Sequence, residues 1–172
     1  MVLNEETSTA ILRTSMTNKE IKIAYKEYTS LDELSAQDRV LAESAIEAVG
    51  TAYAPYSKFN VGAAVRFNDG QIIKGSNQEN AAYPSGICAE RTALFYASAS
   101  RPDAPMNALA IAAAQNGELI PDPVAPCGAC RQVMSQYQFK SGNPMEIILI
   151  GANCIWKFDN VESLLPFIFD SI

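Results

Sequence analysis

The chain has 172 residues, of which 48% are apolar and 19% charged, a composition that excludes a disordered or fibrous chain and fits one domain. Its 13 basic and 19 acidic residues give a net charge of −6. Because proteins that bind a nucleic-acid polymer use Lys and Arg to neutralise phosphates, this charge argues against a polymer partner.

Residues 1–30 are predicted to be an N-terminal extension, partly disordered or carrying a short added strand. The first residues are acidic and polar, without the basic start and apolar stretch of a signal peptide, so we expect a cytoplasmic protein. No apolar run approaches the roughly 20 residues that span a bilayer, so we expect no membrane association. Ile21, Ile23 and Tyr25 alternate, which predicts a strand over 19–29 that would cover a sheet edge or a subunit contact.

Residues 31–172 are predicted to form a single α/β domain. Apolar residues at helical spacing predict helices over residues 36–52, 89–100, 130–139 and 161–165. Alternating or short buried apolar runs predict strands over residues 61–67, 71–75, 108–114, 147–150 and 155–158. We expect strands separated by helices to be parallel and the two short-turn pairs to be antiparallel. The predicted fold is a three-layer α/β/α arrangement with a mixed five-stranded sheet.

The cysteines carry the strongest chemical signal, because the chain has four cysteines and no histidine. Cys127 and Cys130 form a Cys-x-x-Cys at the entry to one predicted helix, and Cys88 stands at the start of another. Any zinc site must therefore use thiolates, perhaps with carboxylates. Three thiolates would leave the fourth tetrahedral position of Zn²⁺ open, as in catalytic sites. Two helix N-termini and a hydrogen bond from Arg91 would ease the negative charge of the cluster.

Glu90 follows Cys88 by two residues, which on a helix is a rotation of about 200°, so the two side chains do not share a face. Glu90 is therefore a poor candidate for a metal ligand. Its carboxylate is better placed to move a proton between a zinc-bound water and a substrate beside the metal.

Two other interpretations of the cysteines remain open. In the first, Cys154 is a fourth ligand that completes a structural Cys₄ zinc site. The alternative role of Cys154 is that of a small buried apolar side chain. A Cys-x-x-Cys before a helix is also typical of redox proteins. Cys88-Ala89-Glu90 upstream of Pro126-Cys127-Gly128-Ala129-Cys130 favours the catalytic interpretation.

These motifs resemble those of the zinc-dependent cytidine and deoxycytidylate deaminases, in which a metal ligand, a Glu two residues later and a Pro-Cys-x-x-Cys recur. The resemblance is specific and runs from about residue 36 to the C-terminus. Three further segments carry it: Ala54-Pro55-Tyr56-Ser57-Lys58-Phe59-x-Val61-Gly62-Ala63-Ala64, Asn77-Gln78-Glu79-Asn80-Ala81-Ala82-Tyr83 and Cys88-Ala89-Glu90-Arg91-Thr92-Ala93-Leu94-Phe95.

The resemblance implies a role for each matching residue. It implies that one zinc ion per subunit is held by Cys88, Cys127 and Cys130, and that Glu90 is the proton shuttle. Other implied roles are contact with the ribose hydroxyls by Asn77 and Glu79, pyrimidine stacking by Phe59, and thiolate support by Arg91. The alternatives are an ordinary core Phe59, turn polar residues at 77 and 79, and a surface charge at Arg91.

The all-cysteine site on a short chain is similar to the homotetrameric branch of that family. This implies a homotetramer in which neighbouring subunits share active sites. Tyr83 and Phe169 are the candidates for residues that a neighbour contributes; the alternative is that they merely pack.

The implied activity is hydrolytic deamination of cytidine and 2′-deoxycytidine to uridine and 2′-deoxyuridine plus ammonia, in pyrimidine salvage. Zinc-bound hydroxide would attack C4 while Glu90 carries the proton. The charge of Glu79, and the lack of a Lys, a second Arg or a Gly-rich nest near the motif, favour a free nucleoside over a nucleotide. A deaminase of a cytosine-containing antibiotic and a zinc-stabilised binding module without catalysis are the alternatives.

Overall fold

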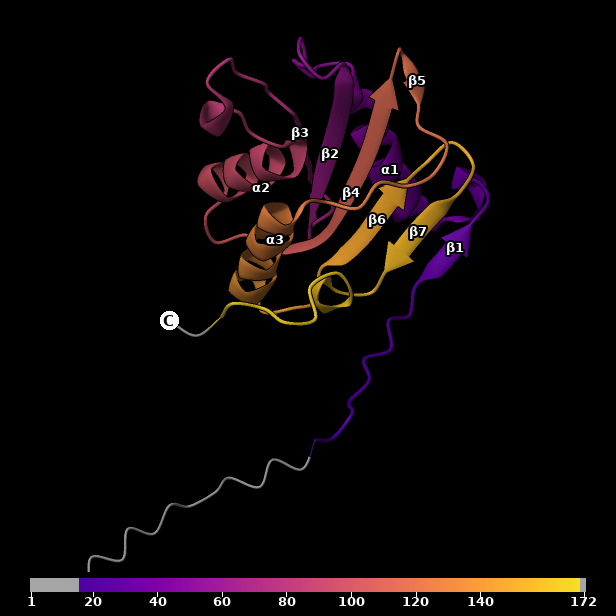
Figure 1. Ribbon diagram of the computed structural model, residues 1–172, viewed down its shortest axis with the longest axis vertical. Helices are drawn as coiled ribbons and strands as arrows, with labels where there is room; N and C mark the ends of the chain where they lie inside the picture. The colour runs from indigo at the N-terminus through magenta and orange to yellow at the C-terminus, as the bar shows by residue number, and fades with distance from the viewer. Residues whose placement is uncertain (1–15, 171–172) are drawn as a thin grey trace, which may run out of the picture.

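One mixed sheet lies at the centre of the computed structural model, which describes residues 16–170 (Figure 1). Within these residues the sheet has seven strands in the order β1-β7-β6-β4-β2-β3, with β5 paired to β4. The strands are β1 (Lys26–Tyr28), β2 (Phe59–Phe67), β3 (Ile72–Ser76), β4 (Met106–Gln115), β5 (Glu118–Leu119), β6 (Glu146–Ile150) and β7 (Ile155–Phe158).

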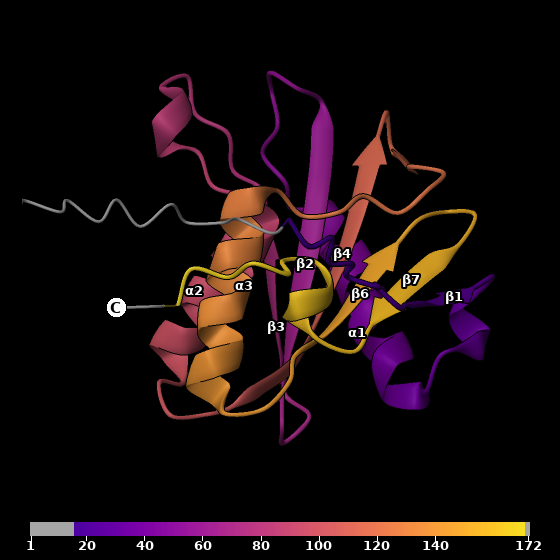
Figure 2. The same ribbon diagram turned by 60° about the horizontal axis from the view of Figure 1, so that its bottom comes forward.

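Three α-helices within residues 16–170 cover the two faces of this sheet, which confirms the predicted three-layer α/β/α class (Figure 2). Helix α1 packs on one face against β2 and β4, whereas α2 and α3 lie side by side on the other. The helices are α1 (Ala36–Val49), α2 (Ala89–Ser100) and α3 (Gly128–Ser141), with 3-10 turns at Leu31–Glu33, Tyr83–Ser85 and Val161–Ser163. The helix predicted at 161–165 is thus only a 3-10 turn.

The strand directions follow the prediction. The pair β4 and β6, separated by α3, is parallel, whereas the short-turn pairs β2–β3 and β6–β7 are antiparallel. The predicted number of five strands is wrong, because β1 and β5 add two short strands. Strand β5 follows a two-residue turn in which Asn116 and Gly117 have φ of 56° and 87°, the geometry of a tight hairpin.

The N-terminal strand is shorter than predicted. Only Lys26–Tyr28 pairs with β7, while residues 16–25 have no regular secondary structure. Strand β7 ends at Phe158, which lies opposite Tyr25 in this register, so residues before Tyr25 have no partner in β7. Residues 1–15 of the predicted extension lie outside the described residues. No helix within residues 16–170 is long and apolar enough to cross a membrane.

Glycines bring two helices close to the sheet. A Cβ atom on Gly62 of β2 would lie 2.2 Å from the Ala45 carbonyl oxygen of α1, and one on Gly75 of β3 would lie 2.5 Å from the Ala93 nitrogen of α2. Only glycine fits at such distances. The second contact fixes the first turns of α2 against β3, and with them the position of Cys88 and Glu90.

A buried ion cluster holds α1 on the sheet. Asp38 Oδ1 accepts a hydrogen bond from Arg66 Nη1 of β2 at 2.9 Å, and Asp38 Oδ2 accepts one from Lys157 Nζ of β7 at 2.7 Å. Lys157 also pairs with Glu146 of β6 at 2.8 Å. Burial alone would raise the pKa of Asp38, but the hydrogen bonds from Lys157 and Arg66 outweigh it and lower this pKa.

We expect Asp38→Asn to lower the free energy of unfolding by about 3 kcal/mol, because it leaves two buried cations short of a partner. The wild-type contribution is present above the usual pKa of 3.8 and is lost as the pH falls through the lower folded-state pKa. Urea denaturation at one protein concentration, between pH 7 and pH 3, measures both effects. The exposed Asp32→Asn serves as the control and should change stability little. A difference between wild type and Asp38→Asn that persists unchanged at the lowest pH would contradict the assignment.

Candidate active site

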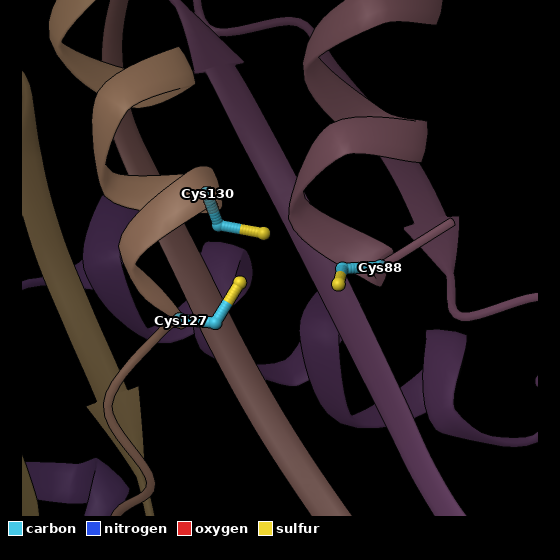
Figure 3. A group of neighbouring side chains, drawn as sticks. All are labelled: Cys88, Cys127 and Cys130. Carbon is cyan, nitrogen blue, oxygen red and sulfur yellow. The ribbon is translucent and has the colours of Figure 1, made fainter. Parts of the chain in front are cut away.

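The first turns of α2 and α3 bring three cysteines together. Cys88 is the N-cap residue of α2, Cys127 is the N-cap residue of α3, and Cys130 lies in the first turn of α3. Their sulfur atoms all lie within 4.8 Å of one another and point into the space between the two helices (Figure 3). The predicted convergence of the two motifs at helix N-termini is therefore confirmed.

The donor set of this group fits zinc. Three thiolates are preferred Zn²⁺ ligands, and a site with three protein ligands keeps one position open for water or substrate. Among residues 16–170 the group contains these three residues and neither Glu90 nor Cys154. Cys154 lies on the turn between β6 and β7 and is half-buried, so the structure gives no support to a Cys₄ site.

The local charges favour a thiolate at Cys88, whereas the hydrogen bond with Cys88 and burial raise the pKa of Cys130. Arg91 Nη2 donates a hydrogen bond to Cys88 Sγ at 3.5 Å. A hydrogen bond with Cys130, followed by the hydrogen bond from Arg91, lowers the pKa of Cys88 to about 5. Neither N-cap cysteine makes a side-chain cap hydrogen bond, so the positive ends of both helices are left to act on the sulfur group.

Glu90 is a buried carboxyl group beside the cysteines. It lies in the first turn of α2, is 5% exposed and lines the cavity described below. Burial raises the pKa of Glu90, and the negative charge of Cys88 raises it further. A carboxyl group with a raised pKa both accepts and returns a proton readily near neutral pH.

A cavity of about 460 Å³ opens next to the sulfur group. Its lining includes Cys88, Cys127 and Glu90 together with residues of β2 and of the segment after β3. The sequence-predicted residues that line the cavity are Phe59, Asn77, Glu79, Tyr83, Cys88, Glu90, Arg91 and Cys127. Cys130 is fully buried behind it.

Two polar residues of the cavity wall are held in place by backbone groups. Asn77 Oδ1 accepts a hydrogen bond from the Val61 amide at 2.8 Å, and Asn77 Nδ2 donates to the Phe59 carbonyl at 2.9 Å. Glu79 Oε2 accepts from the amides of Tyr56 and Ser57 at 2.9 and 3.2 Å. A side-chain hydrogen bond with Ser57 lowers the pKa of Glu79, and these amides lower it further, so Glu79 is a carboxylate at neutral pH.

The two aromatic candidates lie in different places. Tyr83 lines the cavity of its own chain and is 82% exposed. Phe169 is not among the lining residues; its backbone exchanges two hydrogen bonds with the Gln132 side chain of α3. Both residues are therefore largely exposed in the described part of the chain.

The sequence analysis missed Arg131, which supports the cysteine loop. Its Nε donates to the Pro126 carbonyl at 2.7 Å, and its Nη1 donates to the Leu164 carbonyl at 2.8 Å. Arg131 thus ties the residue before Cys127 to the C-terminal segment. Both acceptors are backbone oxygens, which every residue carries, so the sequence does not indicate these contacts.

The fold and site define an α/β/α protein in which three cysteines able to hold a metal ion and a buried carboxyl group meet at one cavity. Residues 35–142 match the family model described as the cytidine and deoxycytidylate deaminase zinc-binding region. The chain belongs to this family and is a zinc-dependent deaminase.

Individual relatives agree with this assignment. The chain is 47% identical to a cytidine deaminase of Sporosarcina psychrophila over 129 residues, which cover 75% of this chain and 88% of the relative. It is 50% identical over 99 residues to one of Halalkalibacterium halodurans, covering 57% and 70% of the two chains. The crystal structure of cytidine deaminase from Burkholderia pseudomallei superposes with a TM-score of 0.62 at 41% identity, covering 76% of this chain and 97% of that chain.

Proposed function

We propose that this protein hydrolyses cytidine and 2′-deoxycytidine to uridine and 2′-deoxyuridine plus ammonia, as a step of pyrimidine salvage. The observation that carries the proposal is one cavity that joins the sulfur group and buried Glu90 to a wall of Phe59, Asn77 and Glu79. The relatives named above are cytidine deaminases, which supports the same substrate class.

In this proposal the cavity wall holds the nucleoside. Phe59 stacks on the pyrimidine ring, because a flat apolar side chain suits a flat base. The Asn77 amide donates a hydrogen bond to one ribose hydroxyl, and the Glu79 carboxylate accepts one from another. The hydrogen bonds from the Tyr56 and Ser57 amides both use Oε2 of Glu79, so Oε1 is the oxygen proposed to face the ribose.

Zinc, when bound by the three thiolates, would supply a Lewis acid that lowers the pKa of a coordinated water. Glu90 takes the proton of the attacking water and delivers it to N3 of the base. The same carboxyl group later carries a proton to the departing ammonia. Burial suits Glu90 to both steps, since its raised pKa lets it hold a proton between them.

A free nucleoside is proposed rather than a nucleotide. Arg91 is the single cationic side chain among the described residues that line the cavity, and its guanidinium is engaged with Cys88. The carboxylate of Glu79 would repel a phosphate nearby. Phosphate sites instead present Arg, Lys or a nest of backbone amides.

The proposed assembly is a homotetramer whose active sites are shared. The exposed rings of Tyr83 and Phe169 are the residues proposed to complete a neighbour's site. Phe169, at 66% exposure and outside its own cavity, is the better placed of the two to reach another subunit.

The test is a spectrophotometric assay with cytidine, 2′-deoxycytidine and cytidine 5′-monophosphate, with and without a zinc chelator. We expect both nucleosides to be converted, the chelator to abolish turnover, and the monophosphate to be at least about tenfold less efficient by kcat/KM. Equal efficiency for the monophosphate would refute the free-nucleoside proposal. Absence of ammonia release by the zinc-loaded protein would refute the activity itself.

A further inference from the structure

The segment before β1 is an apolar arm that, within residues 16–170, forms no strand pair with its own chain. Residues 16–25 run away from the body of the molecule (Figure 1). Ile21, Ile23 and Tyr25 alternate along this arm and are 55%, 51% and 50% exposed. The arm precedes residue 35, where the family region begins, and it contributes nothing to the cavity. Its alternating pattern is that of a strand with one apolar face, on which the side chains of a neighbouring strand can pack.

Strand β1, which continues the arm, lies at the edge of the sheet. It pairs with β7 along one side, and within residues 16–170 no strand pairs with its other side. Unpaired backbone groups of an edge strand are a ready template for another strand. The ring of Tyr25 stacks on that of Phe158 of β7 with centroids 5.3 Å apart, so the apolar face of the arm continues the face of the sheet.

The sequence of the arm is complementary to itself in one antiparallel register. When two copies pair about Ile23, Ile21 lies opposite Tyr25, and the apolar faces coincide. The charged residues then match in opposite signs: Lys19 faces Glu27 and Glu20 faces Lys26. Directly opposed pairs of this kind stabilise antiparallel strands, whereas like charges destabilise them.

The neighbouring registers are unfavourable. A register shifted by two residues keeps the apolar faces together, but it places Lys22 opposite Lys22 in one direction and Lys22 opposite Lys26 in the other. Lys26 and Asp159 already form an ion pair at 3.1 Å, but both side chains are more than half exposed, so this pair is weak and does not prevent a second contact.

We propose that residues 19–27 bind the same segment of a second copy of this chain as antiparallel strands, with the two-fold axis at Ile23. The contact extends both sheets beyond β1 and places Ile21, Ile23 and Tyr25 of the two copies side by side on one face of the joined sheet. A two-fold contact of this kind is closed, so it joins two copies without forming a fibre. Nine residues from each copy make a small interface. The contact would therefore add to the other subunit contacts of the proposed homotetramer.

The test is amine cross-linking of the full zinc-loaded chain, followed by peptide mass spectrometry. In the proposed register the two copies of Lys22 are diagonal neighbours, so a Lys22–Lys22 link is expected; a residue linked to itself proves two copies. We expect Ile23→Asp to lower the yield of this link by about tenfold or more, because two carboxylates would meet on the axis. The control is Val40→Asp, at a residue of equal exposure (52%) on α1, which should leave the link unchanged.

Charge reversal tests the register itself. Glu20→Lys should weaken the link, and the double variant Glu20→Lys/Lys26→Glu should restore it. A Lys22–Lys22 link that is missing from the wild type, survives Ile23→Asp, or is not restored by the double variant would overturn the proposal. If the arm bound another protein, or folded back on its own chain, the Lys22–Lys22 link would be missing from the wild type. Since the link is read without substrate, its failure is distinct from a failure of the proposed deaminase activity.

Discussion

Glu90→Gln is expected to lower kcat for cytidine by about 10²- to 10⁴-fold while the zinc content stays unchanged. Glutamine keeps the size and the burial of the side chain but can neither accept nor return a proton. Zinc is retained because the sulfur group consists of Cys88, Cys127 and Cys130, without Glu90. The loss should appear in kcat more than in KM, since proton transfer matters in the transition state rather than in binding.

The measurements are steady-state kinetics and metal analysis of the same preparations. Glu47→Gln is the matched control, because it makes the same chemical change at an exposed position on α1. It should retain the wild-type kcat. Near-normal turnover by Glu90→Gln would remove the proton-shuttle role, whereas loss of zinc from that variant would show that Glu90 supports the metal site instead.

Much of this fold can be predicted from local patterns. The helical spacing of Leu41, Ala45 and Ala48 marks α1, and all three residues are buried against the sheet. The cysteine site was predictable for the same reason: each motif lies within one turn of a helix start. Local sequence therefore predicts the position of each cysteine on its own helix. The close approach of the two helices depends on the whole fold and is not predicted by local sequence.

The features that sequence could not predict depend on distant residues. Asp38, Arg66 and Lys157 belong to α1, β2 and β7, and no spacing along the chain relates them. The apolar alternation around Ile23 continues beyond the end of β7, so it does not predict where β1 begins. The amide of Asn77 is likewise held by the backbone of β2, a contact that residue type alone does not reveal.

Cys130→Ala is expected to abolish zinc binding and lower turnover by more than about 100-fold, because even removing a group that only supports a metal ligand costs about 10- to 100-fold. Cys130 is fully buried behind the cavity, so no water can replace its sulfur without cost. Because zinc affinity is also folding free energy, added zinc should raise the melting temperature of the wild type but not that of the variant. Cys154→Ala makes the same change outside the sulfur group and should keep both zinc and turnover. Release of the metal by Cys154→Ala together with its retention by Cys130→Ala would contradict the assigned ligands. The zinc would then be bound at the β6–β7 turn and would be structural rather than catalytic.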